Sequence, residues 1–411
     1  MTDVSIVIPC LNEAISLPHC LRGAHAALDR IKQEYGLSGE IVLADNGSTD
    51  GSQDIARAAG ARVVPVAARG YGAALIGGFR AAEGRYLVMA DADGSYDFVE
   101  AVPMIGRLID GADLCMGSRF LGGIKPGAMP WKNRYIGNPV LSGILRLLFR
   151  TRISDAHCGI RALTKDCFHR LRLSGSGMEF ASEMVIKAAL LKVRIDETPA
   201  TLHPDLRDRP PHLRPWRDGW RHLRYLFMLS PTWVFAIPAA VALLLGVAIL
   251  AMAGLHYFGL SPIDNFGTSW SIFAGALLGI GQTSALLAAA SHLYGVRQGY
   301  RVSSGLTRRI SRFVTLETML ASGALIALAG VALLAVVAVR WSASGFDPLA
   351  NIFPVVTGTA LIVLGSQNVL GGFLLAILAG NEAAFLRDIG EGARKSSTSR
   401  QETESEHARA A

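Results

Sequence analysis

Long uncharged stretches in the second half of the chain limit what this sequence can fold into. Four of them are apolar over roughly 20 residues or more, the length that an α-helix needs to cross the hydrocarbon core of a bilayer. They cover residues 233–255, 266–291, 313–339 and 352–380. This pattern favours membrane spans over the buried helices of a soluble protein. We therefore predict a membrane domain of four transmembrane helices.

The loops that join these stretches differ in charge. The loop between the second and third stretches carries Arg297, Arg301, Arg308, Arg309 and Arg312, whereas the other two loops have almost no Lys or Arg. Positively charged loops stay on the cytoplasmic side of a membrane, and four spans place both chain ends on one side. We therefore expect a multi-pass protein of the inner or plasma membrane, with both termini and the amino-terminal half in the cytoplasm.

The first half of the chain has a different pattern. Short runs rich in Val and Ile, at residues 4–8, 40–44, 62–66 and 86–90, alternate with stretches of helical spacing at 14–35, 53–59 and 72–82. Such alternation is typical of a mostly parallel sheet covered by helices. A chain of 411 residues also exceeds the usual size of one domain. The predicted fold class is an α/β domain followed by an all-α membrane domain.

Polar side chains follow three of the predicted strands. These are Asn12 and Glu13 after the first strand, Asp45 and Asn46 after the second, and Asp91 and Asp93 after the fourth. In parallel α/β sheets, ligands bind at the carboxyl ends of the strands. We therefore expect the three pairs to converge on one edge of the sheet.

The acidic pair lies in the segment "VMADADGSYD". Side chains alternate along an extended chain, so Asp91 and Asp93 would point to the same side and reach one divalent cation. Such a cation usually completes its shell with water and phosphate oxygens. The alternative is a solvated turn, because Asp, Gly and Ser are ordinary turn residues.

Two further segments have an ordinary and a functional interpretation. In "ADNGSTDG", either Ser48 or Thr49 caps a helix, or the Asp45 and Asn46 pair bonds the edge of a nucleobase. In "ARGYGAALIGGFRAA", Arg69, Gly70 and Gly72 precede a helix, where a guanidinium and free backbone amides could face phosphate.

Six short motifs occur in the order and at the spacing seen in family 2 glycosyltransferases of the GT-A fold. They are "VIPCLNE", "ADNGSTDGS", "RGYGAAL", "ADADGSYD", "GSRF" and "DAHCGIRA". With four spans following, the chain most resembles the polyprenyl-phosphate glycosyltransferases, relatives of dolichyl-phosphate mannose synthase. The membrane part is similar to that family in the type and number of its spans.

The resemblance implies roles for individual residues. A nucleotide sugar would contact Pro9, Asn12, Glu13, Asp45, Asn46, Arg69, Gly70, Gly72 and Asp91, and Asp91 with Asp93 would bind Mg²⁺ or Mn²⁺. Asn46 stands where many relatives have a second aspartate, which leaves open which residue of that pair reads the base. An acceptor phosphate would contact Arg119 and Arg134, with Arg161 as a further partner. Apart from the resemblance, the Pro- and Arg-rich segment "LHPDLRDRPPHLRP" predicts a mobile loop over the acceptor entrance, with Arg207, Arg209 and Arg214 as phosphate partners. The candidate catalytic residues are Asp93, Asp155, Arg119 and Arg134.

The implied reaction is an inverting, metal-dependent hexose transfer to a membrane polyprenyl phosphate. The donor would be a UDP- or GDP-hexose, with glucose or mannose as the sugar, and the product a lipid-linked sugar for cell envelope glycans. One alternative is a processive polysaccharide synthase, although its Gln-x-x-Arg-Trp motif has only "QGYRV" as a match. The other is a lipid-carrier translocase or scaffold. No nucleic-acid partner is expected, and a homo-oligomer is left open.

We divide the chain into a GT-A catalytic domain at 1–205, an acceptor loop and interfacial helix at 206–231, the membrane domain at 232–385 and a disordered tail at 386–411. Trp216, Trp220, Leu223 and Phe227 share one face of the linker helix, and Arg217, Arg221 and Arg224 lie beside them. This pattern favours a helix at the membrane surface over a core helix with a solvated basic side.

Several roles stay open at this stage. Asp155 could orient the acceptor or form a salt bridge with Arg161. Glu179 and Glu183 fall one helical turn apart. His157 and His203 belong to no metal-spaced cluster, so we do not expect either to bind a metal or act as a base.

Overall fold

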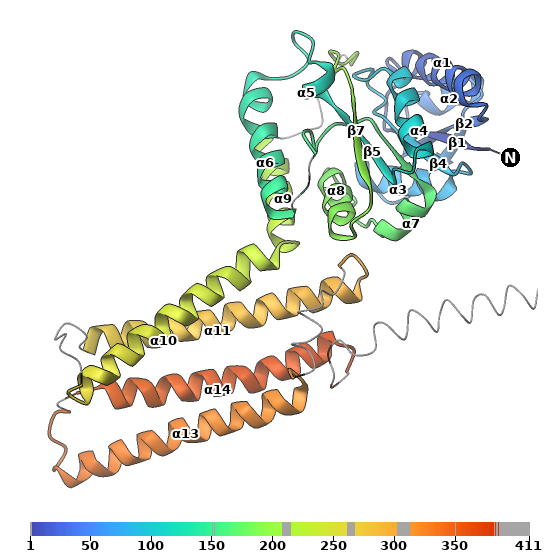
Figure 1. The fold of residues 1–411 in the computed structure, drawn as a ribbon. Helices are drawn as coiled ribbons and strands as arrows, with labels where there is room; N and C mark the ends of the chain where they lie inside the picture. Colours follow the sequence, from blue (N-terminus) through green and yellow to red (C-terminus); the bar gives the residue numbers. More distant parts are fainter. Residues whose placement is uncertain are drawn as a thin grey trace, which may run out of the picture. The chain divides into compact units, whose positions relative to one another are not determined.

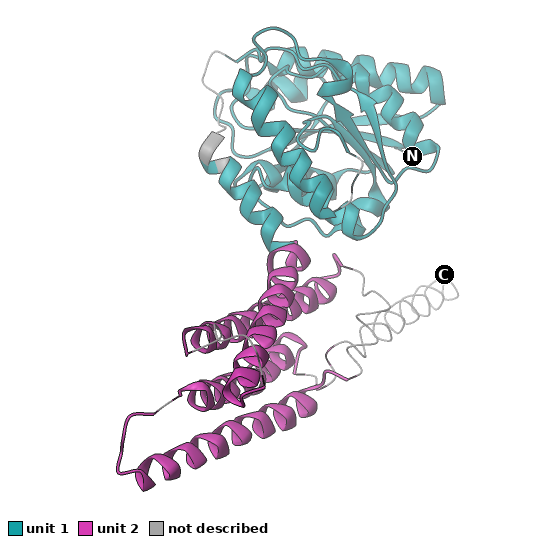
Figure 2. Ribbon diagram, turned by 60° about the vertical axis from the view of Figure 1, so that its left-hand side comes forward, with its two compact units in different colours: residues 1–229 teal, residues 230–411 magenta. Residues whose placement is uncertain are grey.

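Figure 2 shows the two compact units into which the chain divides, residues 1–229 and residues 230–411. The structure is a computed structural model, which describes residues 2–385 apart from 150, 152, 208–214, 261–267, 302–312, 350, 382 and 384. The boundary follows the linker helix, so this helix packs with the first unit.

The first unit is built on a seven-stranded sheet with the order β3-β2-β1-β4-β6-β5-β7. Its strands are β1 Val4–Cys10, β2 Gly39–Asp45, β3 Arg62–Pro65, β4 Tyr86–Met89, β5 Leu114–Ser118, β6 Arg161–Thr164 and β7 Ile195–Pro199. β1 runs parallel to β2 and β4, and β6 runs antiparallel to both of its neighbours. The expected α/β class with a mostly parallel sheet is confirmed.

Helices cover both faces of this sheet (Figure 1). In the first unit they are α1 Leu17–Tyr35, α2 Ser52–Ala58, α3 Tyr71–Ala81, α4 Ala101–Ile109, α5 Arg119–Gly122, α6 Asn138–Phe149, α7 Lys165–Leu171, α8 Phe180–Leu190 and α9 Pro215–Met228. Ile6 and Ile8 of β1 pack in one cluster with buried residues of α1 and α4. Val7 points the other way, towards Gly78 of α3. The period-two alternation of a strand thus divides the core into two layers.

The second unit consists of long apolar helices. They are α10 Ile237–Tyr257, preceded by the π-helical turn η3 Thr232–Ala236, α11 Thr268–Arg297, α13 Leu316–Ala343 and α14 Phe353–Leu378. Four helical segments in the described part of the chain are long and apolar enough to cross a membrane, and each overlaps one of the four predicted stretches.

Glycines let α13 and α14 approach closely. A Cβ added at Gly330 would lie 2.6 Å from the carbonyl oxygen of Gly358, and one at Gly323 would lie 2.7 Å from that of Gly365. Small residues that let backbones touch are the usual contact between helices in lipid, where apolar burial gives no driving force between helices.

Candidate active site

The loops after β1 and β4 meet at the carboxyl edge of the sheet. The parallel register places Val7 of β1 beside Met89 of β4 and Cys10 of β1 beside Asp45 of β2, so the loops that follow leave from one edge. The expectation that Glu13, Asp45 and the acidic pair follow neighbouring strand ends therefore agrees with the strand order.

Arg207 joins the loop after β1, which carries Glu13, to the loop after β4, which carries Asp93. Its Nε donates to both carboxylate oxygens of Glu13, at 3.0 and 3.1 Å, and its Nη2 lies 2.9 Å from Oε1. Its Nη1 lies 3.4 Å from Oδ2 of Asp93. Glu13 and Asp93 are both buried, so a cation between them offsets the cost of burying two carboxylates. Residues 194 positions apart in the sequence therefore form one charged cluster.

The segment that carries Arg207 runs along the acidic turn. The amide of Leu206 donates to the carbonyl of Asp93, and the amide of His203 donates to that of Ser95, both at 2.9 Å. Gly94, with φ of 76°, lies under Leu206. These backbone bonds hold Arg207 over the turn, and they give His203 a role through its backbone amide. Arg209 and Arg214 lie outside the described residues.

The acidic pair has the chemistry of an incomplete cation site. Oδ1 of Asp93 accepts hydrogen bonds from the amide and hydroxyl of Ser95, at 2.9 and 2.6 Å. Burial and the charge of Asp93 raise the pKa of Asp91 above its usual range, although the Tyr71 hydroxyl donates to it. Within the described residues, no group of three or more His, Cys, Asp or Glu side chains could hold a metal. A cation held by these two carboxylates alone would take its other ligands from water and phosphate.

Asp45 holds the turn after β2. Its carboxylate accepts from the amides of Gly47 and Ser48, at 3.1 and 3.2 Å, and from Nε2 of Gln53 at 2.8 Å. The helix α2 that follows has Gly51 at its N-cap, so the alternative in which Ser48 or Thr49 caps the helix is wrong. The carboxylate of Asp45 instead shapes the turn itself.

Asn12 and Asn46 tie this turn to neighbouring segments. Asn12, at φ of 58°, accepts from the amide of Thr49 at 2.8 Å. Asn46 donates to the carbonyls of Val66 and Ala68, at 3.0 and 2.7 Å, and accepts from the amide of Gly70 at 2.7 Å. Its amide group both donates and accepts here, which a carboxylate could not do. This gives a physical reason for asparagine at position 46.

Gly70 and Gly72 make room for another chain segment. A Cβ at Gly70 would lie 2.1 Å from the carbonyl oxygen of Ser176, and one at Gly72 would lie 2.1 Å from that of Gly175. The carboxylate of Glu183 fixes this segment by accepting from the amide of Gly175 at 2.7 Å. Packing therefore accounts for both glycines without a phosphate.

Two other residues of the expected set, and Glu179, whose role the sequence left open, have different settings. Arg69 is exposed and half-buried Pro9 pairs with Ala44 across the sheet. Glu179, which precedes α8, accepts from the amide of Gly177 at 2.9 Å. Of these, Arg69 has the freedom to reach a bound ligand.

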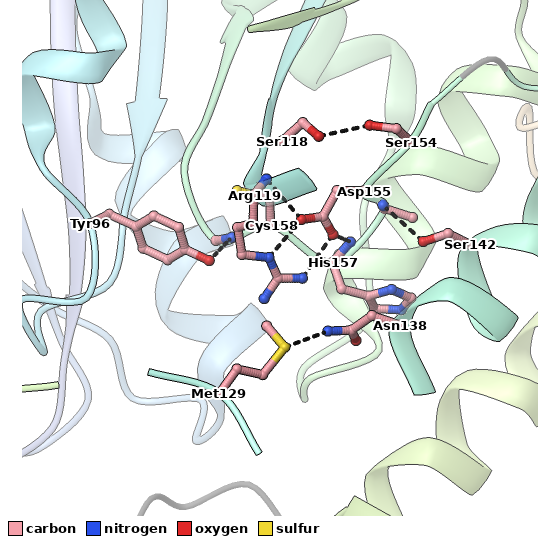
Figure 3. A network of polar contacts seen from close by, with 12 residues as sticks. Tyr96, Ser118, Arg119, Met129, Asn138, Ser142, Ser154, Asp155, His157 and Cys158 are labelled. Carbon is pink, nitrogen blue, oxygen red and sulfur yellow. Dashed lines mark hydrogen bonds and ion pairs between the residues drawn. The ribbon is translucent and has the colours of Figure 1, made fainter. Parts of the chain in front are cut away.

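A second part of the site surrounds Asp155 (Figure 3). This carboxylate is fully buried and accepts from Nε and Nη2 of Arg119, at 2.6 and 2.7 Å, and from the Arg119 amide at 3.1 Å. Burial alone would raise the pKa of Asp155, but the hydrogen bonds and charge of Arg119 lower it below its usual value. The pair joins the start of α5 to the segment before β6.

Arg161 does not pair with Asp155, which corrects one of the two alternatives. Its guanidinium is fully buried and donates to the carbonyls of Cys158, Ala181 and Ala156, at 2.9, 2.8 and 3.0 Å. A group with no exposed surface and these three carbonyl partners is placed to hold the backbone. The sequence led us to expect that Arg161 contacts the acceptor phosphate. Its guanidinium is instead turned to the backbone and is not positioned for that contact.

Loop 154–159, the segment from Ser154 to Gly159, is held along its whole length. The Ser154 amide donates to Glu197 at 2.7 Å, the Ala156 amide to the Ser142 hydroxyl at 3.3 Å, and the Gly159 amide to the Tyr96 hydroxyl at 2.9 Å. The sequence motifs did not reveal Tyr96, Ser142 or Glu197 as partners. Each is a common residue type whose contact spans more than ten positions.

Loop 154–159 also touches the acidic pair. A Cβ added at Gly159 would lie 2.6 Å from Oδ2 of Asp91 and 2.7 Å from Cε2 of Tyr96. The buried Arg119–Asp155 pair and the candidate cation site are therefore built against each other. Arg134 comes from the π-helical turn η2, Asn133–Gly137, where its guanidinium carbon lies 5.4 Å from the centre of the Tyr135 ring.

Helix α9 has three faces. His222 and Leu226 are buried against the first unit, whereas Trp220 is 61 % exposed and Phe227 39 % exposed. Arg217, Arg221 and Arg224 are exposed as well. The aromatic and basic faces that the sequence indicated are thus at the surface, and the buried face was not foreseen. The side chain of Trp216 lies outside the described residues.

Comparison with known proteins places the chain among enzymes that transfer sugars. Residues 5–172 match the family described as "Glycosyl transferase family 2", and residues 289–379 match "Glycosyltransferase family 2 C-terminal transmembrane region". The "Low-salt glycan biosynthesis hexosyltransferase Agl6" of Haloferax volcanii is 34 % identical over 378 residues, which cover 91 % of this chain and 89 % of that protein.

Other relatives match the amino-terminal half. A "Dolichyl-phosphate hexose transferase" of Haloferax volcanii is 28 % identical over 48 % of this chain and 81 % of its own. An "Undecaprenyl-phosphate 4-deoxy-4-formamido-L-arabinose transferase" of Edwardsiella ictaluri is 34 % identical over 39 % of this chain and 48 % of its own. A crystal structure of glucosyl-3-phosphoglycerate synthase from Mycobacterium tuberculosis has a TM-score of 0.41 at 21 % identity, covering 56 % of this chain and 78 % of that one.

Proposed function

The chain belongs to glycosyltransferase family 2, and we propose that it transfers a hexose from a nucleotide sugar to a membrane polyprenyl phosphate with inversion at the anomeric carbon. The observation that carries this proposal is the contact between loop 154–159 and Asp91. This contact sets a buried arginine for the acceptor beside a candidate cation site for the donor. The relatives named for dolichyl and undecaprenyl phosphate support a lipid acceptor.

The donor would bind at the carboxyl edge of the sheet. Asp91 and Asp93 would hold Mg²⁺ or Mn²⁺, which when bound would neutralise charge on the departing diphosphate. Glu13, Asp45 and Asn46 follow strands that end at this edge and, with Arg69, are our candidates for the nucleoside and diphosphate. Arg207 already bridges the two sides of this region through Glu13 and Asp93.

The acceptor would bind beside Arg119. Its Nε and Nη2 are directed at Asp155, so the carboxylate fixes the plane of the guanidinium before a phosphate arrives. Arg134 and Arg207 are the further candidate phosphate partners. A phosphate monoester is mostly dianionic at neutral pH, so its oxygen can attack without a strong general base. Positioning and electrostatics would then supply most of the rate.

We place the catalytic half on the cytoplasmic side of the membrane, where nucleotide sugars are made. The arginine-rich loop between the second and third spans supports this orientation. The product would be a polyprenyl-phosphate hexose that serves later glycan assembly.

A donor screen tests the proposal. Purified protein in nanodiscs is incubated with radiolabelled UDP- and GDP-hexoses, a short polyprenyl phosphate, and either Mn²⁺ or EDTA. Label in a monoglycosyl lipid that depends on the cation is the expected result. Label in polymer would point to a processive synthase, and no transfer from any donor would contradict the proposal.

Asp93→Asn is the matched control for the screen. Losing one carboxylate of the cation site should reduce transfer by at least about 100-fold, since even the partners of metal ligands contribute about 10–100-fold. Membrane insertion and yield should not change. A variant with near-normal transfer would show that the acidic pair does not hold the cation.

A further inference from the structure

Two histidines and a serine connect helix α9 to loop 154–159. The hydroxyl of Ser182 lies 2.8 Å from Nδ1 of His222 and 3.3 Å from Nε2 of His157. The two imidazole rings also meet edge to face, with centroids 5.0 Å apart and planes at 87°. Ser182 is fully buried and His222 is 6 % exposed, so these contacts are shielded from water. We call this set the histidine bridge.

The bridge is part of a longer path. His222 belongs to α9 and Ser182 to α8, while the backbone amide of His157 donates to Oδ1 of Asp155 at 3.2 Å. Asp155 in turn binds Arg119 through both carboxylate oxygens. Hydrogen bonds on either side of His157, joined through the covalent bonds of that residue, therefore connect α9 to the arginine that we assign to the acceptor phosphate.

The bridge controls the orientation of His157. In the described part of the chain, the buried Nδ1 of this ring has no hydrogen-bond partner, so its bond to Ser182 is what fixes the rotation of the ring. Burial, together with the charges of His222 and Arg119, lowers the pKa of His157 to about 3. The ring is therefore neutral at physiological pH and can accept or donate one bond to the serine.

The other side of α9 faces solvent. Trp220, Phe227 and Met228 are exposed, and Arg217 and Arg221 lie beside them. Exposed aromatic and basic side chains on a helix directly before an apolar span are typical of a helix that lies in the membrane interface. The same helix thus presents a lipid-facing surface outward and His222 inward.

We propose that His157, Ser182 and His222 are positioning residues that set loop 154–159, and with it Arg119, according to how α9 sits at the membrane surface. The proposal rests on the function proposed above, because it assigns Arg119 to the lipid acceptor. It predicts an effect on acceptor use that is larger than the effect on donor use. A purely structural role of the same three side chains would affect both substrates alike.

The test uses the full chain in nanodiscs and compares four single variants and the double variant of Ser182→Ala with His222→Leu. Ser182→Ala removes only the hydroxyl, His222→Leu removes the ring nitrogens, and His222→Asn keeps a polar group near the place of Nδ1. Leu226→Val changes the same buried face of α9 one turn further on and leaves the bridge intact. Steady-state kinetics give KM for the polyprenyl phosphate and for the donor, and hydrogen exchange reports the amides of residues 155–159.

Ser182→Ala and His222→Leu should raise the acceptor KM about tenfold and leave the donor KM within about twofold. Both should speed exchange in loop 154–159, whereas His222→Asn should restore most of the acceptor KM and Leu226→Val should match the parent. Because the two changes break one path, the double variant should be no worse than either single one.

Unchanged exchange in loop 154–159, equal changes in both KM values, or additive effects in the double variant would each overturn the proposal. Hydrogen exchange needs no substrate, so it separates this proposal from the function it rests on. If no donor supports transfer but the variants loosen the loop, the proposed function fails and the connection from α9 to the loop stands.

Discussion

At the scale of single residues, Gly159 is the position where the two halves of the candidate site touch. An added methyl group at this glycine would lie 2.6 Å from the Asp91 carboxylate and 2.7 Å from the Tyr96 ring. The Tyr96 ring cannot move aside freely, since it is buried and its hydroxyl accepts from the Gly159 amide. Gly159→Ala should therefore lower kcat/KM about 100-fold, a loss of about 2.7 kcal/mol in transition-state stabilisation.

Gly143→Ala is the control for that prediction. It adds the same methyl group within α6, where nothing lies within 4 Å. Alanine is also the better helix former, so this variant should be at least as stable as the parent. Equal losses of activity in the two variants would mean that the tight contact at Gly159 is irrelevant to catalysis.

The Arg119–Asp155 pair allows structure and function to be separated. Asp155→Ala would leave a guanidinium buried without its partner, which typically costs about 3–5 kcal/mol of stability. Replacing both residues, as in Arg119→Met with Asp155→Leu, removes the buried charges together and should recover most of that stability. Transfer should stay abolished in the double variant. Thermal unfolding measures the stability of each variant, and the transfer assay measures its activity.

Recovered activity in the double variant would show that Arg119 serves the fold alone. A salt bridge with Arg161 was one of the two alternatives that the sequence left for Asp155, whereas the structure pairs this carboxylate with Arg119, 36 positions away. A short motif reveals its own residues but not the distant residue that the fold brings to them.

His157 predicts a dependence of stability on pH. Its pKa is lowered to about 3 by burial and by the charges of His222, Arg119 and Arg161, against the opposing effect of Asp155. The unfolded chain binds a proton near the ordinary pKa of 6.5, and the folded chain does not until pH falls to about 3. This residue should therefore lower the free energy of unfolding by at most about 1.4 kcal/mol per pH unit as pH falls below 6.5.

His157→Asn lacks this titration, so the difference in unfolding temperature between the parent and the variant should shrink as the buffer is taken from neutral pH to about pH 5. The two profiles are compared by thermal unfolding in the same nanodiscs. Parallel profiles across this range would show that His157 does not cause the pH dependence of stability.

At the scale of elements, the contact between α13 and α14 depends on glycine. Gly330→Leu would place a side chain where Gly358 lies 2.6 Å away, and the contact atom is backbone, which cannot rotate aside. We expect separation of the two helices and a loss of several kcal/mol of stability, since overpacking alone costs about 1–3 kcal/mol. Gly279→Leu, in α11 with nothing within 4 Å, should unfold at the parent's temperature.

The same helices show which elements the sequence could predict. Uninterrupted apolar stretches marked the spans, and runs of Val and Ile marked β1 to β4 within one or two residues. β5 Leu114–Ser118, β6 Arg161–Thr164 and β7 Ile195–Pro199 were not predicted, because none of them is a run rich in Val and Ile.

Helix α9 shows a different limit of prediction from sequence. The spacing of its aromatic and basic residues predicted two of its faces. His222 lies between these faces, and a histidine is not an apolar residue that would mark a buried position. Its bond to Ser182, 40 positions away, and the burial of Leu226 one turn further on show that a third face is buried. Polar contacts between distant segments were also what the motifs missed around Asp155 and Arg207.

At the scale of the whole molecule, the remaining prediction concerns how the chain crosses the membrane. Single cysteines introduced at Ser261, Ser304 and Ser396 sample the first short loop, the arginine-rich loop and the tail. If the catalytic half is cytoplasmic, a membrane-impermeant maleimide added to intact cells should label only the cysteine at position 261. Opening the cells should expose the other two.

The native thiols favour this experiment. All five cysteines are free and buried, and burial raises the pKa of Cys20, Cys115, Cys158 and Cys167 to about 12. Since the thiolate is the reactive form, background labelling of the folded chain should be low. Labelling at position 304 in intact cells would show the opposite orientation, in which the catalytic edge lies away from cytoplasmic nucleotide sugars. The proposed donor would then have to be abandoned, even though the fold and its acidic pair would be unchanged.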